Sequence, residues 1–445
     1  MASQLGSPVW LVLVWIVAGL ITLCGALSNA EVAAMLPETG GQYVFFRYMY
    51  GDFVAFLYGW AAFAVINTAS IASIAYVAGT YAEYFITLPR LSLMTEHSIF
   101  LSIPFIGTIY PLENIGVKLF TISAIVILTI INYRSTRSSG ALQVLFTAVK
   151  TGAIILLIVG IFSFGKGNVS NFFTNSIAEP TGWAFVAAIV AAMSGAFWAY
   201  DGWNNITFVA GEIKDPQHTI PKSLLVGLLC CIAVYAAITL SYLFVLPVTA
   251  MARSTFVASE AAQLAIGGLG GTLIALLVII SVIGATNAFI LATTRITFAM
   301  AQRQQFFSWT SFVHPSFGTP GNALVLHCVW SCLLVLSGSF DMLTDMVVFI
   351  TWMFYGLSTL GIFKLRKKMP EANRPYKVWG YPFVPAVFLV FTSMFLAITL
   401  STEIYNYATG VSRVINSVFG LLLVCLGIPF YWYFKRKTGS EGTIA

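Results

Sequence analysis

The sequence reads FWAYDGWNN from Phe197 to Asn205, in the middle of an apolar run that extends from Phe185 to Ala210. An acid and a glycine among bulky aromatic residues predict an interrupted helix, because glycine and short polar residues disfavour a helix interior. An interruption frees backbone N–H and C=O groups, which in lipid are tolerated only where they line a cavity or bind something. The ends of two half-helices can hold a carboxylate and an ammonium together. This stretch is the best candidate for a zwitterion site, and a packed glycine kink is the alternative.

The composition around this stretch predicts an all-α polytopic membrane protein. The chain has 445 residues, of which 59% are hydrophobic and 9% charged, whereas soluble domains are about 45–50% apolar and about 25% charged. The long unbroken apolar runs exclude a β-barrel, whose strands alternate apolar and polar residues. The net charge of +6 is small and no basic stretch has the character of a nucleic-acid-binding segment. Membrane lipid is therefore the expected surrounding, and nucleic acid is not an expected partner.

A membrane-spanning helix needs about 20 mostly apolar residues, and the chain contains eleven such runs, which form one transmembrane domain over residues 1–445. They are approximately Val9–Leu36, Phe53–Ile86, Val117–Asn132, Gln143–Phe164, Phe185–Ala210, Ser223–Leu246, Gly270–Met300, Asn322–Leu336, Asp345–Phe363, Ala386–Thr402 and Val414–Phe434.

Basic residues orient the chain, because lysine and arginine concentrate in cytoplasmic loops. If the C-terminus is cytoplasmic, the cytoplasmic segments contain Arg47, Arg134, Arg137, Lys214, Lys222, Arg303, Lys364, Arg366, Lys367, Lys368, Arg374, Lys377, Lys435, Arg436 and Lys437. The external segments contain only Arg90, Lys166, Arg253 and Arg413. This asymmetry predicts a cytoplasmic C-terminus and, with eleven spans, an external N-terminus.

Three charged residues, Glu31, Lys150 and Asp201, lie within predicted spans, where charges are costly and usually functional. Glu31 stands at the end of its span and is expected to anchor a loop. Lys150 has two interpretations. It either extends to the interface, as lysines near helix ends do, or presents a fixed ammonium to the bundle interior, where it could bind backbone carbonyls as a sodium ion would.

Neither an enzyme nor a metal site is predicted. The four histidines are scattered and the six cysteines fall inside apolar runs, so no metal-binding or disulfide pattern appears. No paired carboxylates or catalytic dyad converge in the spans, and no cofactor is expected. Asn287 is a candidate for hydrogen bonding across helices, although ordinary packing accounts for such residues as well.

Several motifs together resemble the amino acid–polyamine–organocation (APC) superfamily and, within it, the bacterial members of the L-type amino acid transporter family. The resemblance extends almost from end to end of the chain. The motifs are Phe197–Asn204, Gly211–Pro216 with Ile220-Pro221, Ala30-Glu31 with Pro37–Tyr43, Gly51-Asp52 with Ala55-Phe56, Asn287 with Arg295 and Phe298, His314-Pro315 with Thr319-Pro320, and Arg374–Val378.

The resemblance implies a fold of two inverted five-helix repeats and two further helices, which works by alternating access around a site at the membrane midplane. Residues 9–164 are then the remainder of the first repeat, 185–363 the second repeat, and 386–434 the two accessory helices. The family's first helix, with its Gly-Ser-Gly break, has no counterpart here, so the eleven spans correspond to family helices two to twelve. A chain without that helix is expected to bind substrate poorly or not at all, which comparison with an N-terminally extended form would test.

The resemblance also assigns site residues. Phe197, Trp198, Ala199, Tyr200, Asp201 and Gly202 match the broken sixth helix, with Phe197 or Trp198 as the gate and with Tyr200 and Gly202 along the substrate side chain. Asn67, Ser70 and Thr351 fall at positions that line the family's side-chain pocket, and Asn287 matches its eighth helix. Lys150 matches the lysine that stands where sodium-coupled relatives bind a cation, which implies independence from sodium.

The leading function is therefore an amino acid exchanger with neutral or broad substrates, although Asp201 leaves cationic substrates open. A proton-coupled symporter, with Lys150 or Asp201 taking the proton, is the alternative. A transport-dead amino acid sensor and a truncated, non-functional fragment are alternatives of another class. The loop Thr87–Gly116 contains no cysteine, so a disulfide-linked heavy chain is not expected. Short loops suit a bacterial inner-membrane protein.

Overall fold

The computed structural model describes residues 1–134, 136–164, 167–174 and 180–441. Within them, ten helices are long and apolar enough to cross a membrane, and Gly321–Ser337 is a shorter apolar helix. These helices confirm the predicted all-α polytopic fold and coincide with the eleven predicted spans. Lys166, which the charge distribution assigns to an external loop, lies outside the described residues, as do the side chains of Arg137 and Lys437.

The spanning elements follow one another along the chain as mostly unbroken helices. They are α2 (Pro8–Met35), α4 (Asp52–Ala61) continued by η1 (Ala62–Asn67) and α5 (Thr68–Ala82), α7 (Ile115–Arg134), α8 (Thr136–Phe164), α9 (Trp183–Tyr200) followed by η3 (Trp203–Glu212), α10 (Pro216–Val245), α13 (Gly268–Gln302), α14 (Gly321–Ser337), α15 (Phe340–Lys368), α16 (Phe383–Ala408), and α17 (Asn416–Cys425) with α18 (Gly427–Glu441).

Short elements connect these helices, and the sequence analysis did not predict them. They are α1 (Ala2–Leu5), α3 (Gln42–Tyr50), α6 (Leu93–Glu96), the antiparallel strands β1 (Leu101–Ile103) and β2 (Gly107–Ile109), η2 (Val169–Phe172), α11 (Val248–Arg253), α12 (Val257–Ile266) and η4 (Ser308–Ser311).

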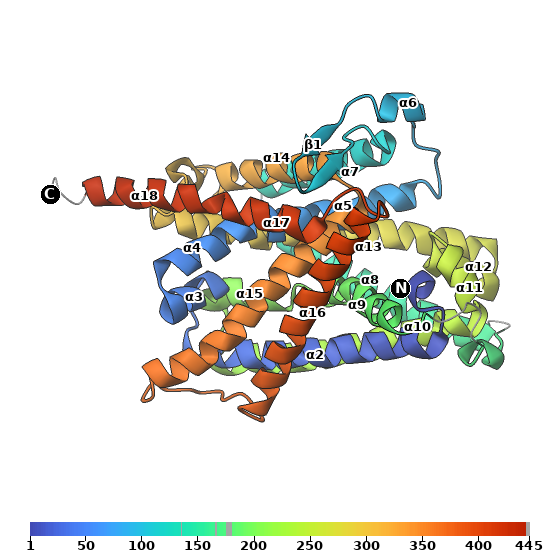
Figure 1. Ribbon diagram of the computed structural model, residues 1–445, viewed down its shortest axis with the longest axis horizontal. Coiled ribbons are helices and arrows are strands. Elements are labelled where there is room, and N and C mark those ends of the chain that lie inside the picture. Colours follow the sequence, from blue (N-terminus) through green and yellow to red (C-terminus); the bar gives the residue numbers. More distant parts are fainter. Residues whose placement is uncertain (135, 165–166, 175–179, 442–445) are drawn as a thin grey trace.

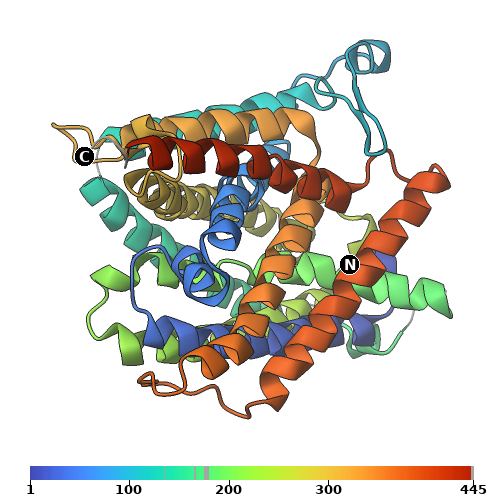
Figure 2. The same cartoon turned by 60° about the vertical axis from the view of Figure 1, so that its left-hand side comes forward.

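Most long helices run side by side, while α15 and α16 cross them obliquely (Figures 1 and 2). The helices α2 and α10 pack against each other, and α13 packs against α5 and α8. Two apolar clusters result, one built mainly from α3 to α5, α7, α13, α14 and α15, the other mainly from α2, α8, α9, α10 and α16. Trp203 at the start of η3 packs against both clusters. The second half of the interrupted helix therefore begins between the two cores.

One turn of the long helix Asp52–Ala82 is a π-helix, η1. Its wider turn leaves carbonyl groups that side chains satisfy: the Thr68 hydroxyl donates to the Phe63 carbonyl at 2.6 Å, and the Trp330 indole donates to the Ala64 carbonyl at 2.8 Å. The π-helix ends at Asn67. Single π-helical turns inside helices are frequent at functional sites.

Glu31 anchors the end of α2, which confirms the role expected for it. Its carboxylate accepts two hydrogen bonds from Arg366, at 2.9 and 2.6 Å, and one from the Val378 backbone N–H at 2.8 Å. Arg374 lies 3.5 Å away. The Glu31 side chain is only 3% exposed, so this buried acid ties α2 to the end of α15 and to the loop that follows.

Candidate functional site

The helix that contains Asp201 is interrupted, as predicted. The helix α9 ends at Tyr200, Asp201 is extended with φ −66° and ψ 159°, and Gly202 has φ 96°. A positive φ of this kind is strained for residues with a side chain and favours glycine. The chain then continues as the 3₁₀-helix η3. The two halves therefore meet at Asp201-Gly202, and the backbone on either side is not paired within one helix.

Side chains from other helices satisfy the backbone near this break. The carbonyl oxygen of Ala199 accepts a hydrogen bond of 2.9 Å from the Tyr235 hydroxyl on α10. The Tyr200 hydroxyl in turn donates to the Trp15 carbonyl on α2 at 3.0 Å. Non-helical backbone at membrane depth is stable only when neighbours supply such partners or a cavity. Here α10 supplies such a partner through Tyr235, and Tyr200 in turn contacts the backbone of α2.

A cavity lies next to the break. Asp201, Asn67 and Thr351 line it together, so three of the residues predicted from the sequence converge. Its volume is about 10 Å³, which is close to the minimum that holds one water molecule. The cavity is therefore much smaller than an amino acid. The further lining residues are Gln42, Tyr58, Asn204, Asn205, Phe289 and Tyr355, with Ile66 and Phe208.

The Asp201 carboxylate has a protein partner inside the membrane region. The Tyr355 hydroxyl on α15 donates to Asp201 Oδ1 at 2.8 Å, and no lysine or arginine among the described residues forms an ion pair with it. Other groups around the cavity are buried without hydrogen-bond partners in the described structure: both side-chain polar atoms of Gln42, Asn67 Nδ2 and Thr351 Oγ1. A buried polar group without a partner is an exception that needs an explanation, such as a ligand.

The structure places the two predicted gate residues away from this cavity. Phe197 packs against Trp352, with ring centroids 3.8 Å apart, and against Phe395 of α16. Trp198 donates from its indole N–H to the Ser73 hydroxyl at 3.3 Å. Phe197 thus lies in an aromatic cluster between α9, α15 and α16, and Trp198 lies against α5.

Ser70 and Asn287 do not themselves line the cavity. The Ser70 hydroxyl donates to the Ile66 carbonyl at 2.6 Å within its own helix. Asn287 accepts a hydrogen bond of 2.7 Å from Asn132 and so joins α13 to α7, which is the cross-helix role considered for it. Gly202 lies next to Phe289, whose ring would be 3.5 Å from a Cβ atom at that position.

Lys150 lines a separate cavity of about 240 Å³ between α8, α10, α12 and α13. The walls are almost entirely apolar, and Ile154, Leu157 and Ile274 are among them. The part of the chain that the structure describes offers the ammonium no hydrogen-bond or ion-pair partner. Tyr235 lines the same cavity and donates to the Ala199 carbonyl near the break, so Tyr235 links this cavity to the end of α9.

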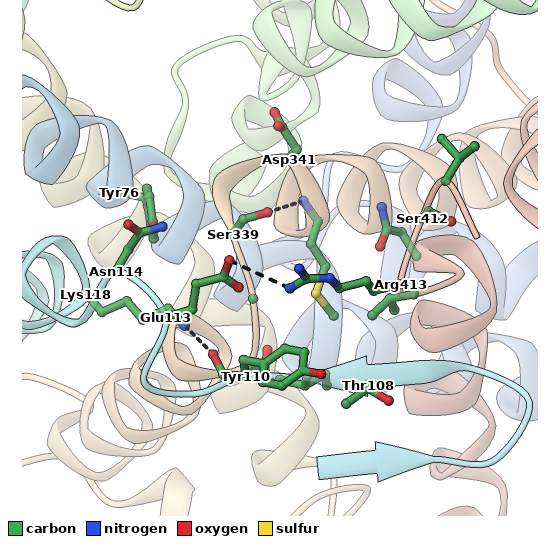
Figure 3. Close-up of a pocket in the computed structure, with 17 residues that line it drawn as sticks. Tyr76, Thr108, Tyr110, Glu113, Asn114, Lys118, Ser339, Asp341, Ser412 and Arg413 are labelled. Atoms are coloured by element: carbon green, nitrogen blue, oxygen red, sulfur yellow. Dashed lines mark hydrogen bonds and ion pairs between the residues drawn. The ribbon is translucent and has the colours of Figure 1, made fainter. Parts of the chain in front are cut away.

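The largest of these cavities, about 370 Å³, lies at the end of the molecule that carries the β-hairpin (Figure 3). Three of its charged side chains, Arg413, Glu113 and Lys118, already have partners, and Asp341 is exposed. Arg413 faces Glu113 at 3.9 Å, and Lys118 donates to the carbonyls of Tyr110, Pro111 and Leu336. In the described residues no group of three or more histidine, cysteine or acidic side chains could hold a metal ion. The Asp201 cavity is the strongest candidate site, because it brings together the predicted residues Asn67, Asp201 and Thr351 and is lined by three buried side chains with unpartnered polar atoms.

Sequence reasoning missed Gln42, Tyr58 and Tyr355 as site residues. A signal existed for Tyr355, since it follows Thr351 by four residues and residues at this spacing share a helix face. Gln42 stands in the Gly40-Gly41-Gln42-Tyr43 segment that carried part of the family resemblance, but nothing in its surroundings predicted that it enters the site. Tyr58 had no such signal.

Comparison with known proteins identifies the chain. A model of the family described as "Amino acid permease" matches residues 1–432. The chain belongs to this family. The predicted resemblance to amino acid permeases of the APC superfamily is confirmed, and the permease is a multi-pass membrane transporter of amino acids, not an enzyme.

Characterised relatives of the permease include exchangers and L-type transporters. It is 30% identical to the serine/threonine exchanger SteT of Bacillus subtilis (strain 168), over 96% of this chain and 89% of that protein. It is 29% identical to the human large neutral amino acids transporter small subunit 2, over 98% and 76% of the two chains. It is 27% identical to the human b(0,+)-type amino acid transporter 1, over 95% and 80%.

Proposed function

We propose that the permease is a sodium-independent exchanger of neutral amino acids, which binds its substrate at the Asp201 cavity. The convergence of Asn67, Asp201 and Thr351 at the break between α9 and η3 is the observation that carries this proposal. Interrupted helices offer backbone N–H and C=O groups to the carboxylate and ammonium of a zwitterion. The kinship with a serine/threonine exchanger and with transporters of large neutral amino acids supports exchange and neutral substrates.

We further propose that residues 9–164 and 185–363 form the two inverted repeats, with 386–434 as accessory helices. Movement of one repeat against the other would open the cavity alternately to each side. The cavity residues come from both segments, with Gln42, Tyr58 and Asn67 in the first and Asp201, Phe289 and Thr351 in the second. Relative motion of the two segments would therefore change the cavity directly.

Lys150 supports independence from sodium. Its ammonium faces an apolar cavity without an anionic partner among the described residues, beside the helix break. A fixed positive charge at this place would do what a bound cation does elsewhere, which is to supply charge next to freed carbonyl groups. Replacement of sodium by choline should then leave the exchange rate unchanged.

The test is uptake of labelled amino acid into proteoliposomes that contain the permease. Exchange predicts rapid uptake only when the vesicles are loaded with unlabelled amino acid, and no stimulation by a pH gradient. Uptake that needs the gradient and ignores internal amino acid would instead establish a proton symporter. Binding of amino acids without any counterflow would identify a sensor.

The proposal that the substrates are neutral rests on the hydrogen bond between Asp201 and Tyr355. The Asp201 carboxylate already accepts a hydrogen bond from Tyr355, so a protein group and not a substrate ammonium accounts for its presence. Asp201→Ser should lower the uptake of serine, leucine and lysine alike. Selective loss of lysine and arginine uptake would show that Asp201 binds cationic side chains.

We place the permease in the inner membrane of a bacterium with its C-terminus in the cytoplasm. The concentration of basic residues in one set of loops supports this orientation. All six cysteines are free, and a disulfide-linked heavy chain is not proposed. A C-terminal reporter that is active only in the cytoplasm tests the orientation.

A further inference from the structure

Three buried polar side chains around the Asp201 cavity form a set of their own. Gln42, Asn67 and Thr351 are 0%, 3% and 2% exposed, and each has at least one polar atom without a hydrogen-bond partner in the described structure. They belong to three different elements, α3, η1 and α15, and line the same small cavity. Other described residues also have buried polar atoms without partners, but these three share one cavity, and such a concentration points to a polar ligand.

The chemistry of the unpartnered atoms defines that ligand. Gln42 Nε2 and Asn67 Nδ2 can only donate, Gln42 Oε1 can only accept, and the Thr351 hydroxyl can do both. A hydroxyl group matches such a set, because it donates one hydrogen bond and accepts others. The cavity volume of about 10 Å³ is smaller than any amino acid, so the pattern of donors and acceptors, and not the volume, defines the ligand. Asp201 and Tyr355 line the same cavity but are hydrogen-bonded to each other, so they are not among the unpartnered groups.

The position of Gln42 is fixed by contact with the second half of the broken helix. The Gly40 N–H donates to the Phe208 carbonyl of η3 at 3.2 Å. Gly41 approaches η3 so closely that a Cβ atom there would lie 2.4 Å from Thr207 Oγ1. The first residue of α3 is thereby held against the segment that bears Asn204 and Asn205. The set is complete only while α3 and η3 stay in contact.

We propose that Gln42, Asn67 and Thr351 bind the side-chain hydroxyl of the substrate, and that the permease selects small hydroxyl-bearing amino acids. The inference rests on the proposed function, since it takes the Asp201 cavity as the substrate site. A site built to hydrogen-bond a hydroxyl discriminates strongly against the analogue that lacks it, because the polar groups of the site then stay buried and unpaired. Gln42 is the residue of this set that the sequence alone did not single out.

The experiment compares threonine with valine, which has the same shape without the hydroxyl. Kd values are measured by titration calorimetry on the purified permease, and counterflow of leucine is measured in parallel. We expect threonine to bind at least about 100-fold more tightly than valine. Gln42→Leu and Thr351→Val should each lower this ratio at least about tenfold, mainly by weakening the binding of threonine.

Thr359→Val is the matched control. Thr359 lies on the same helix as Thr351, is 0% exposed and has an unpartnered hydroxyl, but it does not line the cavity. The threonine-to-valine ratio of this variant should equal that of the parent.

Two results would overturn the inference while leaving the proposed function intact. One is leucine counterflow with a threonine-to-valine ratio near one, as would follow if water alone occupied the polar set. The other is a Thr359→Val variant whose ratio falls as far as that of Thr351→Val. If neither counterflow nor binding of any amino acid is observed, the proposed function fails and the inference fails with it.

Discussion

Tyr355 donates a hydrogen bond of 2.8 Å to Asp201 and thereby connects the middle of α15 to the point where α9 gives way to η3. Asp201 sits where the chain leaves one helix and turns through Gly202 into the next. Tyr355 lies one turn beyond Thr351 on α15, and both residues line the cavity. The contact thus fixes the break relative to one wall of the proposed substrate site.

Tyr355→Phe should weaken substrate binding about tenfold or more. Removal of one partner from a buried hydrogen bond leaves the other unsatisfied at a cost of about 1–3 kcal/mol, and each 1.4 kcal/mol is about tenfold in affinity. Equilibrium binding of labelled amino acid measures the effect. Tyr50→Phe is the control, because the Tyr50 hydroxyl donates to Leu357 of the same helix at 2.7 Å without lining the cavity. Equal losses of affinity in the two variants would contradict the prediction.

Gly41→Ala should separate α3 from η3. The new Cβ would lie 2.4 Å from Thr207 Oγ1, and overpacking of this kind costs about 1–3 kcal/mol. Gly182→Ala is a matched control: Gly182 has φ 59° and ψ −133°, Gly41 has φ 52° and ψ −126°, and nothing lies within 4 Å of a Cβ atom at Gly182. The backbone strain is the same in both variants, so only Gly41→Ala should also slow exchange. Identical thermal unfolding and exchange rates would show that the contact with η3 is unimportant.

Glu31→Ala should destabilise the permease by about 3–5 kcal/mol, because removal of one member of a buried ion pair leaves the others uncompensated. The Glu31 side chain is 3% exposed and Arg374 is 9% exposed. Thermal unfolding in detergent measures the loss as a fall in Tm. Asp52→Asn is the comparison, since the Arg47–Asp52 pair is about half exposed and such pairs contribute about 0–1 kcal/mol. A Tm for Glu31→Ala within a degree of that of Asp52→Asn would refute the assignment.

Lys118→Met should lower the stability of the permease, whereas Lys150→Met should lower its exchange rate and leave its stability unchanged. Lys118 is 2% exposed and donates to three backbone carbonyls, so its loss should lower stability by about 2 kcal/mol or more. Lys150 makes no such hydrogen bonds within the described structure, so Lys150→Met should keep its Tm. Exchange should nevertheless fall at least about tenfold, because the fixed charge beside the break is gone. A Lys150→Met variant with full exchange would exclude this role.

The sequence was sufficient to predict the spans and the interruption. Span length follows from bilayer thickness, and the pattern at Asp201-Gly202 follows from the conformational freedom of glycine. Both depend on local properties of the chain, and the structure agrees with both. The convergence of Asn67 and Thr351 on Asp201 came from the family resemblance instead, since no local property brings η1, α15 and the break together.

The orientation of side chains around each helix axis was beyond sequence reasoning. A helix that is apolar on every face has no pattern that says which face enters the core, and Phe197, Trp198 and Tyr200 accordingly contact three different neighbours. The short helix α3 was missed for another reason. Nine residues of mixed polarity are too few to span a bilayer, and tertiary contacts of α3 with α4 and α15, and of the preceding Gly40 with η3, place Gln42 in the cavity.

The π-helical turn that ends at Asn67 bears on the geometry of this site. A π-helical turn closes i→i+5 hydrogen bonds and is therefore wider than the α-helical turns around it. Regular pitch over the same segment would rotate Asn67 by about 100° and turn its amide away from Gln42 and Thr351. Substitutions that restore regular α-helical pitch over Ala62–Asn67 should therefore impair the proposed site even where they leave the fold intact.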